Sequence, residues 1–301
     1  MNILNKTLLL LVLPVIITVA DTSKPISQLD FSSLVNDFME EGNVLKKTIN
    51  LSGKERMLTQ NMTKLALQSS LNIQKEKSRK ALKKVADLYG KTLNGFKNGD
   101  SDLGLKPATN KKVKEQIAIV EKAWKPFYEA VNKIVDGKDK DEKALKYIIA
   151  NNEELLKLSN DLVEAYEASN TSVNYLEKAR LHTVNIAGRQ RMLTQKMTKE
   201  KLLILKGYKE YEPKLAKSVK LFDTSLTALI KGDKSQNITK PTNKKIINQL
   251  KVVSELWEKL KPLYEKKKNS AKELATIITK NEVLLEEMNN MVKMAEVEVE
   301  Y

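Results

Sequence analysis

The sequence predicts an all-α protein made of two tandem antiparallel four-helix bundles. Three observations support this fold class. Leu, Lys, Glu and Ala dominate the 301 residues, only 10 are Gly and 7 are Pro, and alternating strand patterns are absent. Long stretches with helical periodicity are separated by short segments that carry glycine or proline. The chain also repeats itself. Long helices with short connections pack as antiparallel bundles.

The repeat is clearest in one short motif. The nine residues from Arg56 to Lys64 return from Arg191 to Lys199 with a single difference, Asn61 against Lys196. Similar residues surround both motifs and recur further along, and the spacing between the copies drifts only from 135 to 129 residues. This length is common for a domain and too long for a solenoid repeat. The chain is therefore expected to hold two copies of one module.

Each module is expected to contain four helices, and breakers occupy the joints between them. The breakers are Gly95, Gly99 and Gly104 before Pro107, then Gly137, Gly207, Pro213 and Gly232 before Pro241. Thr109 and Thr242 are predicted to be N-caps. The expected helices are 28–73, 76–97, 109–136 and 140–169 in module 1 (28–169), and 172–206, 212–231, 242–268 and 270–298 in module 2 (172–298).

The joint between the modules has two interpretations. No Gly or Pro lies between Lys138 and Ala187, and the heptad that contains Leu155 and Leu162 continues in phase, which slightly favours one continuous helix of ~100 Å. Alternatively, residues 169–172, with the sequence Ser-Asn-Thr-Ser, form a turn and a cap.

The N-terminus is predicted to be an export signal, residues 1–20. Lys6 precedes an apolar run from Leu8 to Ala20, and small residues come before the polar Asp21. The run is shorter than the roughly 20 residues that span a membrane. We expect a periplasmic protein, with an uncleaved N-terminal anchor as the alternative.

Charge and composition exclude several classes. The net charge is +15, but the lysines are spread over every segment, so nucleic acid is not an expected partner. The absence of Cys excludes disulfides and thiolate chemistry. No nucleophile with a base, no metal-ligand cluster and no phosphate loop occurs, so we expect neither an enzyme nor a cofactor.

The helix that carries the motif is predicted to have two buried faces. Leu51, Leu58, Met62 and Leu65 fall on one side as a bundle-core stripe. A second seam with apolar ends and a polar centre lies nearly opposite, at spacings of 4, 3, 4, 3 and 4. That seam consists of Ile49, Gly53, Arg56, Gln60, Thr63 and Leu67, and of Val184, Gly188, Arg191, Gln195, Thr198 and Leu202 in the second copy.

If two such seams meet, glycine allows close approach and the arginines converge. Two guanidinium groups repel one another, and a small planar oxyanion between them would match their forked donors. The expected anion-binding residues are Gly53, Arg56, Gln60, Gly188, Arg191 and Gln195. In the alternative, each arginine pairs with a carboxylate such as Glu55 or Glu200.

Other recurring residues are expected to be structural. Trp124 and Trp257, and the methionines of the motif, are predicted to pack in the core. His182, the only histidine, is expected to have a packing or capping role. The acidic pairs Glu153-Glu154 and Glu286-Glu287 are expected to face solvent.

The two motifs resemble the signature of PilJ/NarX-type sensor domains, roughly N-x-A/S-G-x-x-R-M-x-S/T-Q. The resemblance covers residues 49–60 and 184–195 and extends to both modules through their architecture. It implies a periplasmic four-helix bundle of the kind found in chemoreceptors and nitrate/nitrite sensor kinases. In nitrate-responsive members the motif arginine contacts the anion at a dimer interface, which carries over to Gly53 with Arg56 and Gly188 with Arg191.

The sequence departs from the family because no second hydrophobic stretch and no signalling domain follow. We therefore expect an exported protein that senses a small, nitrate- or nitrite-like oxyanion and works with a membrane sensor kinase or chemoreceptor. A homodimer and an intrachain pseudo-dimer are both open at this point. The alternative function is a structural helical module for dimerisation or receptor interaction that binds no small molecule.

Overall fold

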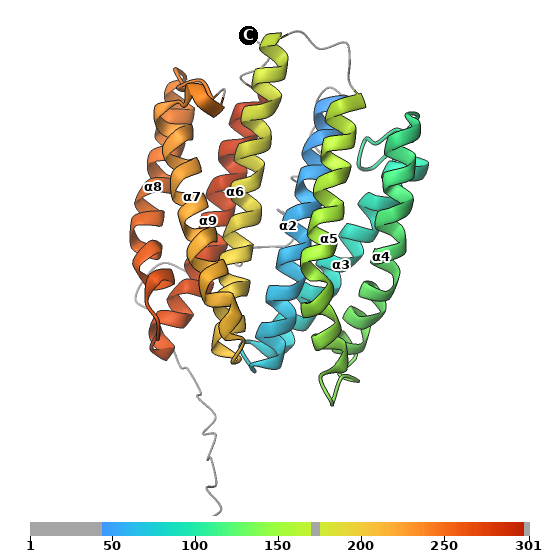
Figure 1. Cartoon of the computed structure of the whole chain (residues 1–301), viewed down its shortest axis with the longest axis vertical. Coiled ribbons are helices and arrows are strands. Elements are labelled where there is room, and N and C mark those ends of the chain that lie inside the picture. The colour runs from blue at the N-terminus through green and yellow to red at the C-terminus, as the bar shows by residue number, and fades with distance from the viewer. Residues whose placement is uncertain (1–43, 170–174, 237, 298–301) are drawn as a thin grey trace, which may run out of the picture.

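The computed structural model describes residues 44–169, 175–236 and 238–297, and no β-strand occurs among them, so the all-α prediction is confirmed (Figure 1). The predicted export signal, residues 1–20, and the predicted helical residues 28–43 lie outside this part of the chain. The first group of helices is α2 (Val44–Ser70), α3 (Lys75–Asn98), α4 (Lys111–Val135) and α5 (Lys143–Ser169). The second group is α6 (Tyr175–Leu205), α7 (Glu212–Lys231), α8 (Lys244–Glu265) and α9 (Ala271–Val297).

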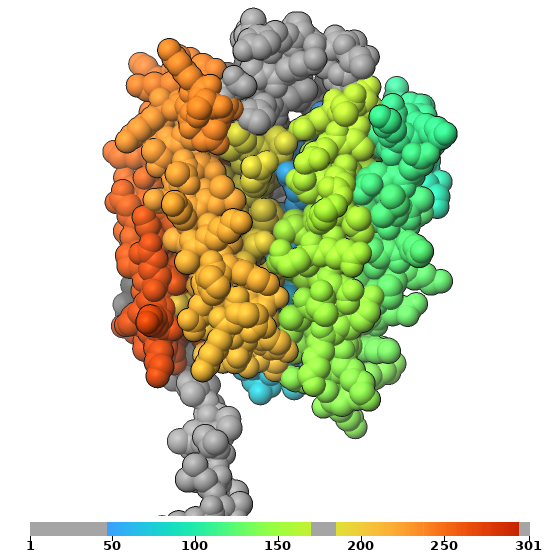
Figure 2. All heavy atoms as spheres, viewed as in Figure 1, coloured from blue at the N-terminus to red at the C-terminus, as the bar shows by residue number. Residues whose placement is uncertain are grey.

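The helices pack as two antiparallel bundles, α2–α5 and α6–α9, that lie side by side (Figure 1). Helices α2 and α6 pack against each other at the centre of the molecule. In the space-filling view, α2 shows only in small patches between the two halves (Figure 2). The two motif-bearing helices thus occupy equivalent positions and form the junction between the bundles.

Helices α5 and α6 run antiparallel in different bundles, so the expectation of one continuous helix is wrong. Helix α5 ends at Ser169, and α6 begins at Tyr175 and runs alongside α2 in the same direction (Figure 1). At the far end of this pair, Lys206 Nζ donates to Ser70 Oγ over 2.8 Å. An unbroken heptad shows only that both segments carry an apolar face. The heptad pattern alone does not predict that α2 and α6 bury their second faces against each other.

The connections repeat as the helices do. Gly99 and Gly232 end α3 and α7 with φ angles of 83° and 78°, which glycine adopts without strain. The N-caps of α4 and α8 are Asn110 and Asn243, whose side chains accept backbone N–H groups. The predicted caps, one residue earlier, are therefore wrong: asparagine also satisfies the orphan amides, and it stands nearer to the first turn.

Helix α2 is buried on nearly all sides, as the prediction of two buried faces requires. Its core stripe and its seam are both buried, and the seam residues of α6 from Gly188 onward are buried as well. The methionines of both motifs and the two tryptophans are also core residues. The side chains of Val184 and His182 lie outside the described part. None of the helices described here is long and apolar enough to cross a membrane.

Candidate anion site

The two motif arginines converge at the junction of α2 and α6. Arg56 and Arg191 are each only 2% exposed. A Cβ atom added to Gly188 would lie 3.2 Å from Arg191 Nη2 and 3.8 Å from Arg56 Nη2. Because both distances start from the same point, the two Nη2 atoms are at most about 7 Å apart. Gly53 plays the same part on α2, where an added Cβ would lie 3.3 Å from Arg56 Nη2.

The asparagines of the two motifs hold these arginines across the junction. Arg56 Nη2 donates to Asn185 Oδ1 over 2.6 Å, and Arg191 Nη2 donates to Asn50 Oδ1 over 2.8 Å. Each arginine thus contacts the asparagine of the other helix, which is the reciprocal pattern of a two-fold interface. The recurring Asn of the motif therefore has a defined role that sequence reasoning did not assign.

Helix α5 adds a further contact to Arg56. Arg56 Nη1 donates to Asn160 Oδ1 over 3.0 Å, and Asn160 Nδ2 donates in turn to Glu164 over 2.7 Å. Asn185 Nδ2 likewise donates to Glu167 over 2.8 Å. Two carboxylates thus orient the amides that hold the guanidinium.

Arg56 is not paired with a carboxylate, since no described Asp or Glu lies within 4.0 Å of its nitrogens. The alternative pairing with Glu55 is wrong because that carboxyl group is buried and accepts no hydrogen bond. Glu200 instead lies 4.0 Å from Lys196. Neutral amide oxygens therefore leave the positive charge of Arg56 uncompensated by direct contact.

Burial and neighbouring charges both act on the Arg56 guanidinium. Burial is the main cause that lowers its pKa to about 10, the charges of Arg189 and Arg191 lower it further, and those of Glu167 and Glu164 oppose the shift. The guanidinium is still charged at neutral pH. Of its five N–H donors, one binds Gly53 O at 3.5 Å and two bind Asn160 and Asn185. The other two donors, one on each Nη, are not used in these three hydrogen bonds.

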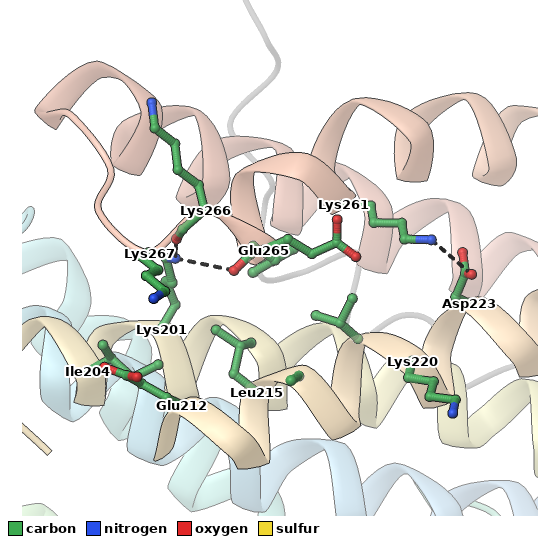
Figure 3. Close-up of a pocket in the computed structure, with 13 residues that line it drawn as sticks. Lys201, Ile204, Glu212, Leu215, Lys220, Asp223, Lys261, Glu265, Lys266 and Lys267 are labelled. Atoms are coloured by element: carbon green, nitrogen blue, oxygen red, sulfur yellow. Dashed lines mark hydrogen bonds and ion pairs between the residues drawn. The ribbon is translucent and has the colours of Figure 1, made fainter. Parts of the chain in front are cut away.

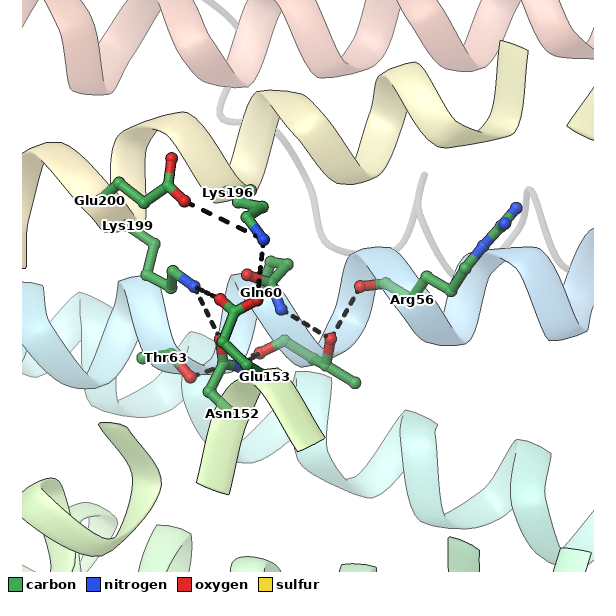
Figure 4. A network of polar contacts seen from close by, with 9 residues as sticks. Arg56, Gln60, Thr63, Asn152, Glu153, Lys196, Lys199 and Glu200 are labelled. Atoms are coloured by element: carbon green, nitrogen blue, oxygen red, sulfur yellow. Dashed lines mark hydrogen bonds and ion pairs between the residues drawn. The ribbon is translucent and has the colours of Figure 1, made fainter. Parts of the chain in front are cut away.

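The predicted glutamines, Gln60 and Gln195, form hydrogen bonds separate from those of the arginine side chains. Gln60 Nε2 donates to Thr59 Oγ1 over 3.1 Å, and Thr59 Oγ1 donates to the carbonyl of Arg56 over 2.8 Å. The Arg56 side chain extends away from Gln60 (Figure 4). Gln195 and Thr194 repeat the arrangement. The structure brings together Gly53, Arg56, Gly188 and Arg191, and places the glutamines deeper along the junction.

A comparison with known families identifies both halves of the chain. Residues 41–148 and 153–279 match the type IV pili methyl-accepting chemotaxis transducer N-terminal domain, PilJ. The chain belongs to the PilJ family. Two PilJ copies in tandem confirm the resemblance that the motifs predicted. No curated protein matches the chain.

Further along the junction from Arg56, an ion pair with a buried lysine joins the two bundles (Figure 4). Lys199 of α6 is 1% exposed, and its Nζ donates to Asn152 Oδ1 over 2.8 Å and to Glu153 over 2.5 Å, both on α5. Lys196 reaches Glu153 as well, at 2.8 Å. Burial alone would raise the pKa of Glu153, but the two lysine charges outweigh it and hold the pKa at about 2.

Glu154 and Glu286 are exposed as expected, whereas Glu153 is 39% exposed and also pairs with two lysines. At the repeat position of Lys199, Lys64 is buried, burial lowers its pKa, and the charge of Glu282 opposes that shift. Glu282 is the repeat counterpart of Glu153. The recurrence of Asn-Glu on the last helix of each copy could have shown that these acids have a partner.

Proposed function

We propose that the two PilJ copies bind one small oxyanion, nitrate- or nitrite-like, between Arg56 and Arg191. The observation that carries this proposal is the convergence of two buried guanidinium groups, with Nη2 atoms at most about 7 Å apart. Two N–H···O bonds of roughly 2.7–3.2 Å that meet at one oxygen, or at two oxygens of one small anion, cover such a span. An anion there relieves the repulsion between the arginines.

Binding acts on the packing of the molecule. Each arginine belongs to a different bundle, so an anion that both contact ties α2 to α6. The family is a sensory family of chemotaxis transducers and is not catalytic. We therefore infer that the anion alters how the two bundles pack and that a partner protein reads this change.

The partner is a membrane sensor kinase or chemoreceptor, and the protein works in the periplasm. Both parts of the proposal follow from the PilJ membership and from the export signal that the sequence predicts at residues 1–20. The basic surface, with a net charge of +15, would also raise the local concentration of small anions.

The second candidate function is a structural module without a ligand. The reciprocal Arg–Asn bonds favour it, because they fix the register of α2 against α6 without any anion. The two candidates differ in one measurable property. Only a sensor should bind nitrate with a free energy that depends on Arg56 and Arg191.

Calorimetric titration of the full chain with nitrate, nitrite and chloride tests the proposal. We expect one oxyanion per chain, and loss of binding in Arg56→Ala with Arg191→Ala. Arg56→Lys keeps the charge but loses the fork, so it should weaken binding while the helical circular dichroism is unchanged. Arg79→Ala is the matched control, since Arg79 lies on α3 and pairs with Glu76 at 3.5 Å. Binding that survives the double substitution, or no binding to the wild type, would favour the structural module.

A further inference from the structure

The second PilJ copy contains a pocket of about 470 Å³ (Figure 3). It lies between the end of α6, α7 and α8. Leu215, Val219 and the neighbouring Ala216 supply apolar surface from α7, and Tyr264 lines it from α8. The volume falls within the range of small-molecule sites.

The lining of this pocket differs from the matching part of the first copy. Two of its residues stand where the first copy has buried aliphatic residues at the same helix positions. The replacements introduce an amine and a phenol. The equivalent pairs are Ala66 and Lys201, and Val131 and Tyr264.

Lys201 is the central polar group of the pocket. It is only 6% exposed, and its Nζ donates to the carbonyl oxygens of Tyr264 and Lys266. An ammonium carries three donors, so one is left for a ligand. No described carboxylate lies within 4.0 Å of this amine. By contrast, Lys261 on the rim is already paired with Asp223 at 3.0 Å.

We propose that this pocket binds a small organic monocarboxylate. The carboxylate accepts a charge-assisted hydrogen bond from Lys201, and the apolar body lies along Leu215 and Val219. Leu215, Ala216 and Val219 form an apolar wall of the lining that faces the body of the ligand. The apolar wall therefore favours an anion with an apolar body over an inorganic anion.

The pocket is also connected to the motif helix. The hydroxyl of Tyr264 lies 2.7 Å from Thr198 Oγ1 and accepts from Asn281 Nδ2 at 3.3 Å. Asn281 donates in turn to the carbonyl of Thr194 over 2.7 Å. A ligand against Lys201 and Tyr264 thus contacts the helix that carries Arg191, from the side opposite to α2. This second site does not use either motif arginine.

Titration of the full chain with hexanoate, followed by calorimetry, tests the proposal, and hexanamide serves as the uncharged probe of the same shape. We expect hexanoate to bind at least about tenfold more tightly than hexanamide, because the charge-assisted bond is lost in the amide. Lys201→Met should abolish this preference. Ala216→Trp should block binding without touching the core, because Ala216 is exposed.

The controls separate this site from the oxyanion site. Lys220→Met removes an exposed rim amine and should leave hexanoate affinity within about twofold. Arg56→Ala with Arg191→Ala should leave hexanoate binding intact even if nitrate binding is lost. Equal affinity for hexanoate and hexanamide, no binding at millimolar concentration, or binding that survives both Lys201→Met and Ala216→Trp would overturn the proposal.

Discussion

The residue before Arg56, Glu55, carries a buried carboxyl group. Glu55 is 1% exposed, and neither of its oxygens accepts a hydrogen bond. Burial raises its pKa well above the ordinary value. The repeat counterpart is Gln190, whose Nε2 donates to the carbonyl of Phe222 over 3.1 Å. When it is protonated, Glu55 has the shape of that glutamine and offers one O–H donor where the glutamine offers two N–H donors.

Stability should therefore depend on pH through Glu55. The folded pKa lies above the unfolded one, so this carboxyl contributes stability below the unfolded pKa that is lost as pH rises towards the folded pKa. Glu55→Gln should remove up to about 1.4 kcal/mol per pH unit from the slope of the unfolding free energy. Urea unfolding between pH 5 and pH 8 measures this slope. Gln190→Glu should add a slope of the same sign, and equal slopes in wild type and Glu55→Gln would refute the protonated state.

The motif glycines should separate stability from binding. Gly188→Ala gains helix propensity of about 1 kcal/mol, but its Cβ would lie 3.2 Å from Arg191 Nη2. The flexible guanidinium can move away, so we expect an unchanged or higher melting temperature and oxyanion affinity that is at least tenfold weaker. Gly90→Ala is the control, because its Cβ meets Trp124 at 3.3 Å, far from the arginines in the chain. If Gly188→Ala bound nitrate as tightly as the wild type, Gly188 would not be needed to position the Arg191 guanidinium.

The sequence predicted the glycines and arginines of the site but not the groups that hold them. Gly53, Arg56 and their counterparts could be found because they recur at fixed spacing. Asn160 could not, since it meets Arg56 only after α5 packs against α2, 104 residues away in the chain. The glutamines recur equally well, yet they bind the threonines next to them and do not hold the arginines. Recurrence identifies residues under constraint without showing which contact constrains them.

At the scale of helices, the ion pair between the buried Lys199 and Glu153 should stabilise the junction of the two bundles. Removing one partner of a buried ion pair costs roughly 3–5 kcal/mol, because it leaves the other charge without compensation. We expect Lys199→Met to approach this range and Glu153→Gln to cost less, since Glu153 is 39% exposed. A double-mutant cycle by urea unfolding measures the coupling.

The pair Lys157 and Asp161 is the matched control for that cycle. It has a similar separation, 2.8 Å, but its lysine is 72% exposed. Its coupling should be about 0.5 kcal/mol or less. If both cycles gave the same small coupling, the inter-bundle pair would have no special role in holding the halves together.

Helix positions were predictable because local rules decide them. The structure places helices where periodicity and the breakers predicted them, with ends that differ by a few residues. The joint after Ser169 was not predictable from its heptads, because both a rod and a turn bury the same apolar stripe. The polar seam distinguishes the two arrangements, because only side-by-side bundles bury Arg56 and Arg191 against each other within one chain.

For the whole molecule, the fused pair predicts a monomer with one oxyanion site. Light scattering should give the mass of one chain, and nitrate affinity should not change with protein concentration. At a nitrate concentration of 100 times the dissociation constant, the unfolding free energy should rise by about 2.7 kcal/mol. Arg56→Ala with Arg191→Ala should lose this gain. A dimer with two sites would mean that the seams also pair between chains.

The covalent link between the two halves has a consequence for how the site can change. In a dimer of identical subunits every substitution enters twice, and the ligand meets the same groups from both sides. In this chain a substitution enters once, as Glu55 opposite Gln190 and Asn61 opposite Lys196 illustrate. The residues that one motif helix contributes to the site can therefore change while those of the other helix stay the same. Such a site can bind a ligand whose two ends differ chemically.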